Sequence, residues 1–202
     1  MKKYRLVYFA LILLSSIIMG SGYGFFSINK GINQSSLKIK NGSWQRYKEM
    51  DLSVNLLQRA IIARMGLFAL KQEEVLYFEA STDSQGRPLE SQYDYELTGV
   101  DLDARYWSLT LYGEDFFLIP NRADKYSLNS STVIMKPDDI KHFNITLSNK
   151  TKVNNWIPTG DKKQKIHLTL RLYNPSEKLY SDLNISNLPQ IKRFENRSIT
   201  DE

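Results

Sequence analysis

The uncharged segment Leu6–Phe26 is the feature that most restricts how this chain can fold. Its aliphatic part ends at Met19, and small residues and then aromatic residues complete it. As a helix rising 1.5 Å per residue, about 20 apolar residues match a bilayer core of roughly 30 Å. We therefore expect residues 1–26 to form a transmembrane helix whose aromatic residues lie at the far interface.

Charge around this segment predicts its orientation. Lys2, Lys3 and Arg5 precede the apolar run, and residues 1–26 contain no acidic residue. Positive charge stays on the cytoplasmic side, so we expect a bacterial inner-membrane protein with a cytoplasmic N-terminus and a periplasmic or other extracytoplasmic domain. The alternative is a signal peptide cleaved near Gly20-Ser21-Gly22, which would leave a soluble periplasmic domain. The apolar run continues through Phe26, which favours the uncleaved anchor.

Composition allows one folded domain and excludes several kinds of site. Of the 202 residues, 42% are hydrophobic and 12% aromatic, which is enough for a sizeable core. Beyond the apolar run, basic and acidic residues are interspersed and nearly balanced, so we expect no nucleic-acid partner. The chain has no cysteine, and His142 and His167 lack the spacing of metal ligands. We therefore expect no metal or other cofactor.

Domain boundaries follow from the local composition. Residues 27–43 are rich in Ser, Asn, Gly and Lys, and we interpret them as a juxtamembrane linker. The folded domain is expected over residues 44–195, beginning at Trp44, and residues 196–202 are expected to be a frayed tail.

One soluble helix is predicted over Asp51–Leu70. Asp51 is a good N-cap, and apolar residues recur behind it at three- and four-residue spacing. The simplest interpretation is a helix that packs on one face or end of a sheet. The alternative is an amphipathic helix on the membrane surface, which the weakly basic polar face disfavours.

Beyond Glu74 the hydrophobic pattern has a period of two. Expected strands cover Val75–Ala80, Ser91–Leu97, Arg105–Tyr112, Phe116–Ile119, Thr132–Met135, Phe143–Leu147 and Lys165–Tyr173. The first two should form an antiparallel pair around the turn at Thr82–Pro88. Many short strands at this spacing predict a mainly β fold, an antiparallel β-sandwich or barrel, and residues 174–202 should be irregular.

Two of these strands have one apolar and one polar face. In Arg105–Tyr112, the side chains of Trp107, Leu109 and Leu111 share one face, which we assign to the core. The opposite face carries tyrosine, serine and threonine. Lys165–Tyr173 repeats the pattern, with isoleucine and leucine facing inward.

A set of motifs along the chain is similar to one known family. The motifs are Gly42-Ser43-Trp44, Arg59-Ala60, Ala63–Leu70, Glu73–Ala80, Asp83 with Gly86–Leu89, Trp107–Tyr112, Asn155–Pro158, Leu168–Pro175 and Leu188–Arg193. In order and spacing they resemble the DUF1214 family of bacterial proteins of unknown function, in the form with an N-terminal membrane span. The resemblance covers nearly the whole chain.

The resemblance implies a jelly-roll-like β-sandwich, which in the family often follows a companion domain. Here the apolar segment stands in place of that companion. The family has no established catalytic residues to carry over. One departure is Leu89-Glu90-Ser91, where relatives tend to carry Leu-Asp-Gly after the proline.

Polar and aromatic residues on the outward faces suggest a candidate binding site, comprising Tyr112, Asn155, Trp156, Arg171 and Tyr173. If the strands that carry Tyr112 and Arg171 are neighbours, these side chains could form a groove for a sugar, a peptidoglycan fragment or a carboxylated ligand, with Arg171 as a forked donor. The alternative is a buried network with a structural role.

Catalysis has less support in the sequence. Ser108, His167 and Asp94 could be drawn as a hydrolytic triad, but Ser108 lies in a strand and no Gly-X-Ser-X-Gly elbow is present. We expect a membrane-anchored binding or scaffolding module that contacts the lipid bilayer through residues 6–26 and an envelope glycan or protein through its domain. The alternative is an envelope hydrolase or carbohydrate-active enzyme that uses the same groove.

Overall fold

The computed structural model describes residues 2–32, 38–47, 56–64, 70–71, 73–137, 141–181 and 188–194. The chain forms two compact units. The first comprises Met1–Ser36 and Met50–Ala69, and the second comprises Leu37–Glu49 and Leu70–Glu202.

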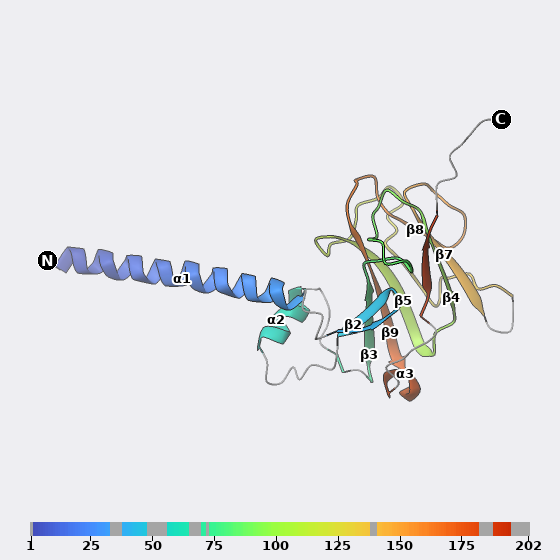
Figure 1. Ribbon diagram of the computed structural model, residues 1–202, viewed down its shortest axis with the longest axis horizontal. Helices are drawn as coiled ribbons and strands as arrows, with labels where there is room; N and C mark the ends of the chain where they lie inside the picture. The colour runs from blue at the N-terminus through green and yellow to red at the C-terminus, as the bar shows by residue number, and fades with distance from the viewer. Residues whose placement is uncertain are drawn as a thin grey trace. The chain divides into compact units, whose positions relative to one another are not determined.

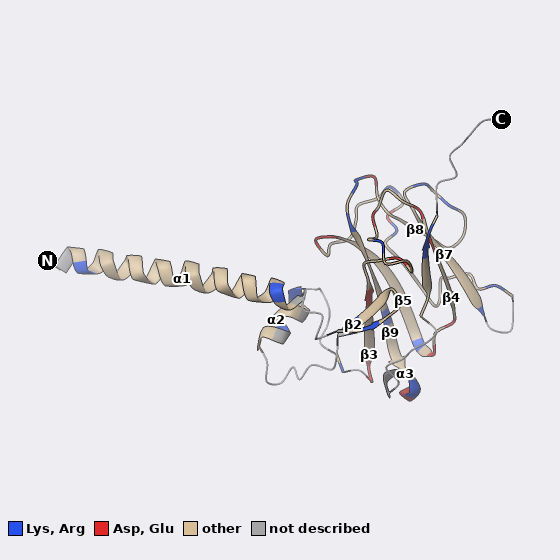
Figure 2. Cartoon of the chain, in the orientation of Figure 1, with Lys and Arg blue, Asp and Glu red and all other residues tan. Residues whose placement is uncertain are grey.

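In the first unit, helix α1 runs without a break over Lys2–Ile32 (Figure 1). Within it, Tyr4–Gly31 contains an apolar window of 18 residues with a mean hydropathy of 1.9 and no buried residue, so by length and composition it could cross a membrane. An N-terminal signal sequence would have the same properties. Charged residues occur only toward its two ends (Figure 2). The helix extends into the segment that we predicted to be a linker.

Helix α2, Leu56–Arg64, packs against the end of α1. The side chain of Ile61 is 1% exposed, and it occupies the space where a Cβ atom at Gly31 would lie. Ile61 is thus buried against helix α1. The sequence had suggested that this helix packs on one face or end of a sheet. The predicted helix was longer: residues 51–55 and 65–69 lie outside the described residues, and Leu70 is not helical.

Among its described residues, the second unit has ten strands and a short helix, α3 (Glu177–Ser181). The six-stranded sheet has the order β1 (Lys38–Asn41), β2 (Trp44–Tyr47), β3 (Val75–Ala80), β9 (Ile166–Pro175), β5 (Ala104–Gly113) and β6 (Ser127–Asn129). The four-stranded sheet has the order β10 (Gln190–Arg193), β4 (Tyr95–Val100), β7 (His142–Ser148) and β8 (Trp156–Pro158). The segment Lys38–Asn41, which we also assigned to the linker, is therefore a strand.

Apolar side chains from both sheets share one core, as a sandwich requires. Strands β5 and β9 are antiparallel neighbours at its centre, with Leu109 opposite Leu170. Trp107 is 1% exposed, and its ring centroid lies 5.2 Å from that of Phe143 in the other sheet. Its indole N–H donates to Asp101 Oδ1 over 3.1 Å. The mainly β fold and the inward assignment of these residues are confirmed, while the jelly-roll connectivity stays a prediction.

Strand pairing differs from the prediction in two places. Val75–Ala80 is strand β3, but its neighbours are β2 and β9, so it does not form a hairpin with the next strand. That next strand is β4, which begins at Tyr95 and belongs to the other sheet. In addition, β7 and β8 are parallel, so the smaller sheet is mixed and not purely antiparallel.

Two predicted strands are turns and loops instead. Phe116 in the segment Phe116–Ile119 has a φ of 64°, which an extended strand does not permit. In Thr132–Met135, the amides of Thr132 and Val133 donate to Asn129 O, and the Asn129 side chain accepts further bonds there. The short strands β6, β8 and β10 were not predicted, because three or four residues carry little periodicity.

The turn after β3 connects the two sheets. Asp83 is 2% exposed, and its Oδ1 accepts from the amides of Gln85 and Arg87, both over 2.9 Å. Gly86 has a φ of 81°, which favours glycine. Ser84 N donates to Ile191 O over 2.8 Å, and Ile191 N donates to Ser84 Oγ over 3.0 Å. Because Ile191 is in β10, the turn holds the end of β3 against the four-stranded sheet.

Candidate binding face

The outer side of the six-stranded sheet carries a group of tyrosines around one arginine. We call it the tyrosine–arginine face; its residues are Tyr77, Tyr106, Tyr112, Arg171 and Tyr173. They come from β3, β5 and β9, whose alternate residues point into the core. The strand register puts Arg171 between Tyr77 and Ser108, and Tyr173 opposite Tyr106. This confirms that the strands of Tyr112 and Arg171 are neighbours.

Arg171 is fixed on this face by two hydroxyl groups. Its Nη1 donates to Thr110 Oγ1 over 3.3 Å, and its Nη2 donates to the Tyr112 hydroxyl over 3.0 Å. The guanidinium carbon lies 5.7 Å from the centroid of the Tyr112 ring. Both hydrogen-bond partners are neutral, so these bonds orient the guanidinium group without neutralising its charge.

The other members of the tyrosine–arginine face are the four tyrosines. The rings of Tyr106 and Tyr173 lie 5.6 Å apart between centroids, with an interplanar angle of 51°. Burial, followed by the proximity of Tyr173, raises the pKa of the Tyr77 hydroxyl, and the positive charge of Arg171 partly opposes this. The side chains of Tyr106, Tyr112, Arg171 and Tyr173 are all partly exposed. The face therefore combines an oriented cation with rigid aromatic surface.

The triad that could be drawn from Ser108, His167 and Asp94, which the sequence disfavoured, is not assembled. Ser108 pairs with Arg171 of β9. Arg171 and His167 are four residues apart in that strand, so Ser108 lies about 13 Å along the strand direction from His167. The ring of His167 stacks on Phe116, with centroids 5.2 Å apart. Asp94 precedes β4 of the other sheet, and its carboxylate lies 3.4 Å from Lys152 Nζ. These three side chains cannot act on one substrate atom.

Asn155 has a structural position. It is 8% exposed, and its amide group exchanges two 2.7 Å hydrogen bonds with the backbone of Ile134. It also donates to Asn144 O over 3.0 Å. All three bonds go to the main chain, so Asn155 fastens the loop at residue 134 to β7. Its side chain has little capacity left for a ligand.

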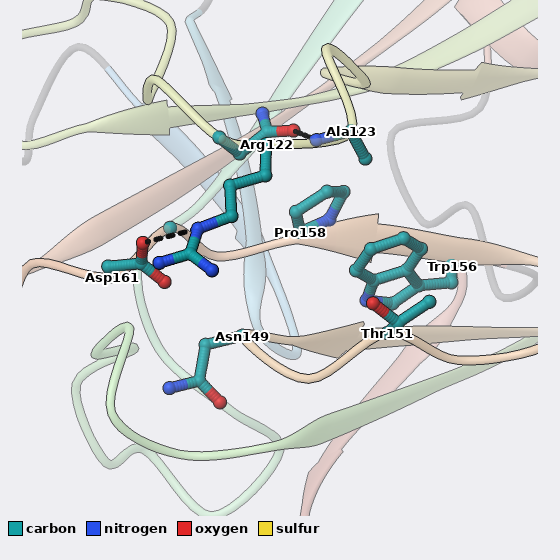
Figure 3. A pocket seen from close by; sticks show the side chains of 9 residues that line it. Arg122, Ala123, Asn149, Thr151, Trp156, Pro158 and Asp161 are labelled. Carbon is teal, nitrogen blue, oxygen red and sulfur yellow. Dashed lines mark hydrogen bonds and ion pairs between the residues drawn. The ribbon is translucent and has the colours of Figure 1, made fainter.

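Trp156 lies in the four-stranded sheet, with an exposed fraction of 8%. Its neighbour Ile157 points into the core, so Trp156 points to the opposite side. The indole N–H donates to Ser148 O over 2.9 Å. The ring borders a small open pocket of about 180 Å³ (Figure 3), whose lining residues are Asn121, Arg122, Ala123, Asn149, Thr151, Trp156, Pro158, Gly160 and Asp161.

Polar groups in this pocket already interact with one another. Arg122 points toward Asp161, and Arg122 Nε lies 3.7 Å from Asp161 Oδ2 (Figure 3). The side chain of Arg122 is 94% exposed and that of Asp161 is 75% exposed, so water screens this pair strongly. The pocket is small and lacks a buried charge, which makes it a weaker candidate than the tyrosine–arginine face.

The five residues selected from the sequence therefore do not form one groove. Tyr112, Arg171 and Tyr173 lie together on the six-stranded sheet, whereas Trp156 is in β8 of the other sheet and Asn155 directly precedes that strand. Sequence reasoning missed Tyr77 as a member of the face. Its outward position in Val75–Ala80 was visible from the alternation, but the pairing of β3 with β9 was not.

Comparison with known proteins is consistent with this fold. A family model described as "Protein of unknown function (DUF1214)" matches residues 74–177. The chain belongs to the DUF1214 family. The family inferred from the motifs is thereby confirmed over residues 74–177, while the motifs outside this range and the form with a membrane span stay predictions. The DUF1214 match begins just before β3 and ends at the start of α3, so it includes the whole tyrosine–arginine face. No curated protein matches the chain.

Two solved structures are similar to this DUF1214 protein. The crystal structure of the VPA0106 protein from Vibrio parahaemolyticus has a TM-score of 0.56 and 23% sequence identity, covering 69% of this chain and 35% of that one. At this identity the similarity concerns the fold alone. A putative uncharacterized protein from Burkholderia cenocepacia has a TM-score of 0.47 and 14% identity, covering 90% of this chain and 44% of its own. This chain thus spans less than half the length of either protein.

Proposed function

We propose that this protein is a membrane-anchored binding module of the bacterial cell envelope, and that its tyrosine–arginine face binds a protein partner. The proposal rests on the exposure of Arg171 and on the identity of its hydrogen-bond partners. Its guanidinium group is partly exposed, and within the described residues its hydrogen bonds go to the neutral hydroxyls of Thr110 and Tyr112. A carboxylate on a partner could accept two parallel hydrogen bonds from such a group.

The shape of the face favours a protein over a small glycan. Small ligands bind in concave sites that bury most of their surface, and this face is the side of a sheet. Tyrosine and arginine are the residue types enriched among the strongest contributors to protein interfaces. The Tyr106–Tyr173 pair supplies rigid aromatic area that loses little conformational entropy on binding.

Helix α1 supports the anchor in this proposal. Its apolar surface is exposed along residues 4–23. The residues before the apolar run include basic residues and no acidic residue. A helix of this kind crossing the inner membrane would leave the sandwich on the extracytoplasmic side. Alkaline phosphatase fused after Glu202 should then be active, and a fluorescent protein that folds only in the cytoplasm should be dark when fused there. The opposite pattern would refute the topology.

Photocrosslinking in cells tests the binding face. We expect p-benzoylphenylalanine at Tyr106 to give a discrete protein adduct, and the same probe at Val153, which is 86% exposed in a loop near the four-stranded sheet, to give none. Arg171→Met should reduce the Tyr106 adduct about tenfold or more, as for an interface hot spot. Arg122→Met, at an exposed arginine elsewhere, should leave it unchanged. Equal adducts at Tyr106 and Val153, or an adduct that survives Arg171→Met, would refute the proposal.

A further inference from the structure

We propose that α2 is an interfacial helix that binds the lipid headgroup layer beside the end of α1. This inference rests on the proposed function in one respect, since it requires α1 to span the membrane. It adds a second and separate membrane contact, and it concerns only the unit that contains α1 and α2.

Packing fixes where α2 meets α1. Residues of α1 from Tyr4 to Tyr23 are exposed, whereas Ser27, Ile28 and Asn29 are partly buried and Gly31 is buried. Ile61 of α2 lies against Gly31, where a larger residue would collide with it. Figure 1 shows α2 beside the last turns of α1. The contact is therefore confined to the end of the apolar helix.

That end coincides with the depth of the headgroup layer. The apolar run ends at Phe26, and Gly31 is five residues further, which is about 7 Å along a helix axis. Headgroup regions add roughly 5 to 8 Å on each side of the hydrocarbon core. If the run Leu6–Phe26 fills the core, α2 lies at the level of the headgroups, because Ile61 is held at Gly31.

The exposed side chains of α2 suit this position. Leu56 is 78% exposed and Leu57 is 43% exposed, which would be unfavourable in water but favourable at the acyl boundary. The polar face of α2 is only weakly basic by itself, but Arg59 and Arg64 are exposed on it, and Lys30 is exposed at the end of α1 that α2 contacts. These cations match the phosphate groups of anionic lipids. The occupant we assign to this surface is therefore a bilayer that contains anionic lipid.

The absence of cysteine from the chain allows single-site depth measurement. The full chain is reconstituted in vesicles of phosphatidylcholine and phosphatidylglycerol, with a fluorophore on Leu56→Cys, Ile17→Cys or Val153→Cys. Nitroxide lipids labelled at the headgroup or deep in the acyl chain act as quenchers. We expect headgroup-level quenching at Leu56, acyl-chain quenching at Ile17 in the middle of α1, and no quenching at Val153 on the sandwich.

The three sites separate the two proposals. Deep quenching at Ile17 with none at Leu56 would refute the interfacial helix and leave the anchor intact. No quenching at Ile17 would refute the anchor, and the inference about α2 would fail with it. Quenching at Val153 equal to that at Leu56 would show that the sandwich surface also meets lipid, which would overturn a contact specific to α2.

A second comparison tests the role of charge. The double variant Arg59→Gln/Arg64→Gln should reduce quenching of the Leu56 label in the vesicles that contain phosphatidylglycerol, while quenching at Ile17 stays constant. The control is Arg122→Gln, which removes an exposed arginine from the sandwich and should change neither signal. An unchanged Leu56 signal in the double variant would refute the attraction to anionic headgroups.

Discussion

The variant Asp83→Asn would remove the charge from the turn that connects the two sheets while keeping its shape. The asparagine carbonyl can still accept from the amides of Gln85 and Arg87, the two bonds that Asp83 Oδ1 makes at 2.9 Å. The bond from Arg87 Nε to Asp83 Oδ2 at 2.7 Å is lost, because an amide N–H₂ would face the guanidinium donor.

The expected cost is a loss of about 2 to 3 kcal/mol in the free energy of unfolding. Hydrogen bonds to a charged group contribute roughly 1.5 to 3 kcal/mol each, against about 1 kcal/mol for neutral ones. The Asp83 side chain is 1% exposed, so water cannot replace the lost partner there, but Arg87 is 34% exposed and regains some hydration. Asp161→Asn is the matched control: its ion pair with Arg122 is exposed, so we expect little change.

Tryptophan fluorescence during urea unfolding provides the measurement, since Trp44, Trp107 and Trp156 all lie in the sandwich and none lies in α1 or α2. The midpoint should fall in Asp83→Asn at neutral pH and remain near the wild-type value in Asp161→Asn. An unchanged midpoint in Asp83→Asn would refute the role assigned to the turn.

The effect should depend on pH in a definite direction. Burial acts to raise the pKa of Asp83, but hydrogen bonds from the Arg87 side chain and from the Arg87 and Gln85 amides outweigh it and hold that pKa below its ordinary value of 3.8. The stabilisation from this carboxylate is therefore complete above about pH 4 and is lost as the pH falls through the lowered pKa. The difference between wild type and Asp83→Asn should shrink in that range, and a constant difference would contradict the linkage.

Three further variants test the fold. Asn155→Ala should lower the free energy of unfolding in urea by about 2 to 3 kcal/mol, because it leaves backbone groups at Ile134 unpaired. Asn149→Ala, at an exposed site, should leave that free energy unchanged. Gly86→Ala should lose about 1 kcal/mol through its positive φ, and an equal or higher midpoint would show that the turn relaxes. Trp107→Ala should lose about 3 to 5 kcal/mol from the centre of the core, and a loss below about 1 kcal/mol would refute its assigned packing.

Much of the candidate site could be recognised from the sequence. Alternation in Arg105–Tyr112 and Lys165–Tyr173 assigned each side chain to the core or to the outer side, because strand geometry is local and has a period of two. The outward positions of Tyr112, Arg171 and Tyr173 were predicted in this way. Asn155 and Trp156 were grouped with them on residue type alone, and residue type contains no information about which sheet a strand joins.

The sequence by itself determined the apolar helix, the two central strands with their inner and outer faces, and the membership of the DUF1214 family. Each depends on local spacing or on the order of motifs. Only the tertiary structure decided that β3 pairs with β9 and that Asn155 fastens a loop. It also decided that Ile61 of α2 packs on α1. These contacts join residues that are distant in the chain, so hydrophobic periodicity cannot distinguish one partner from another.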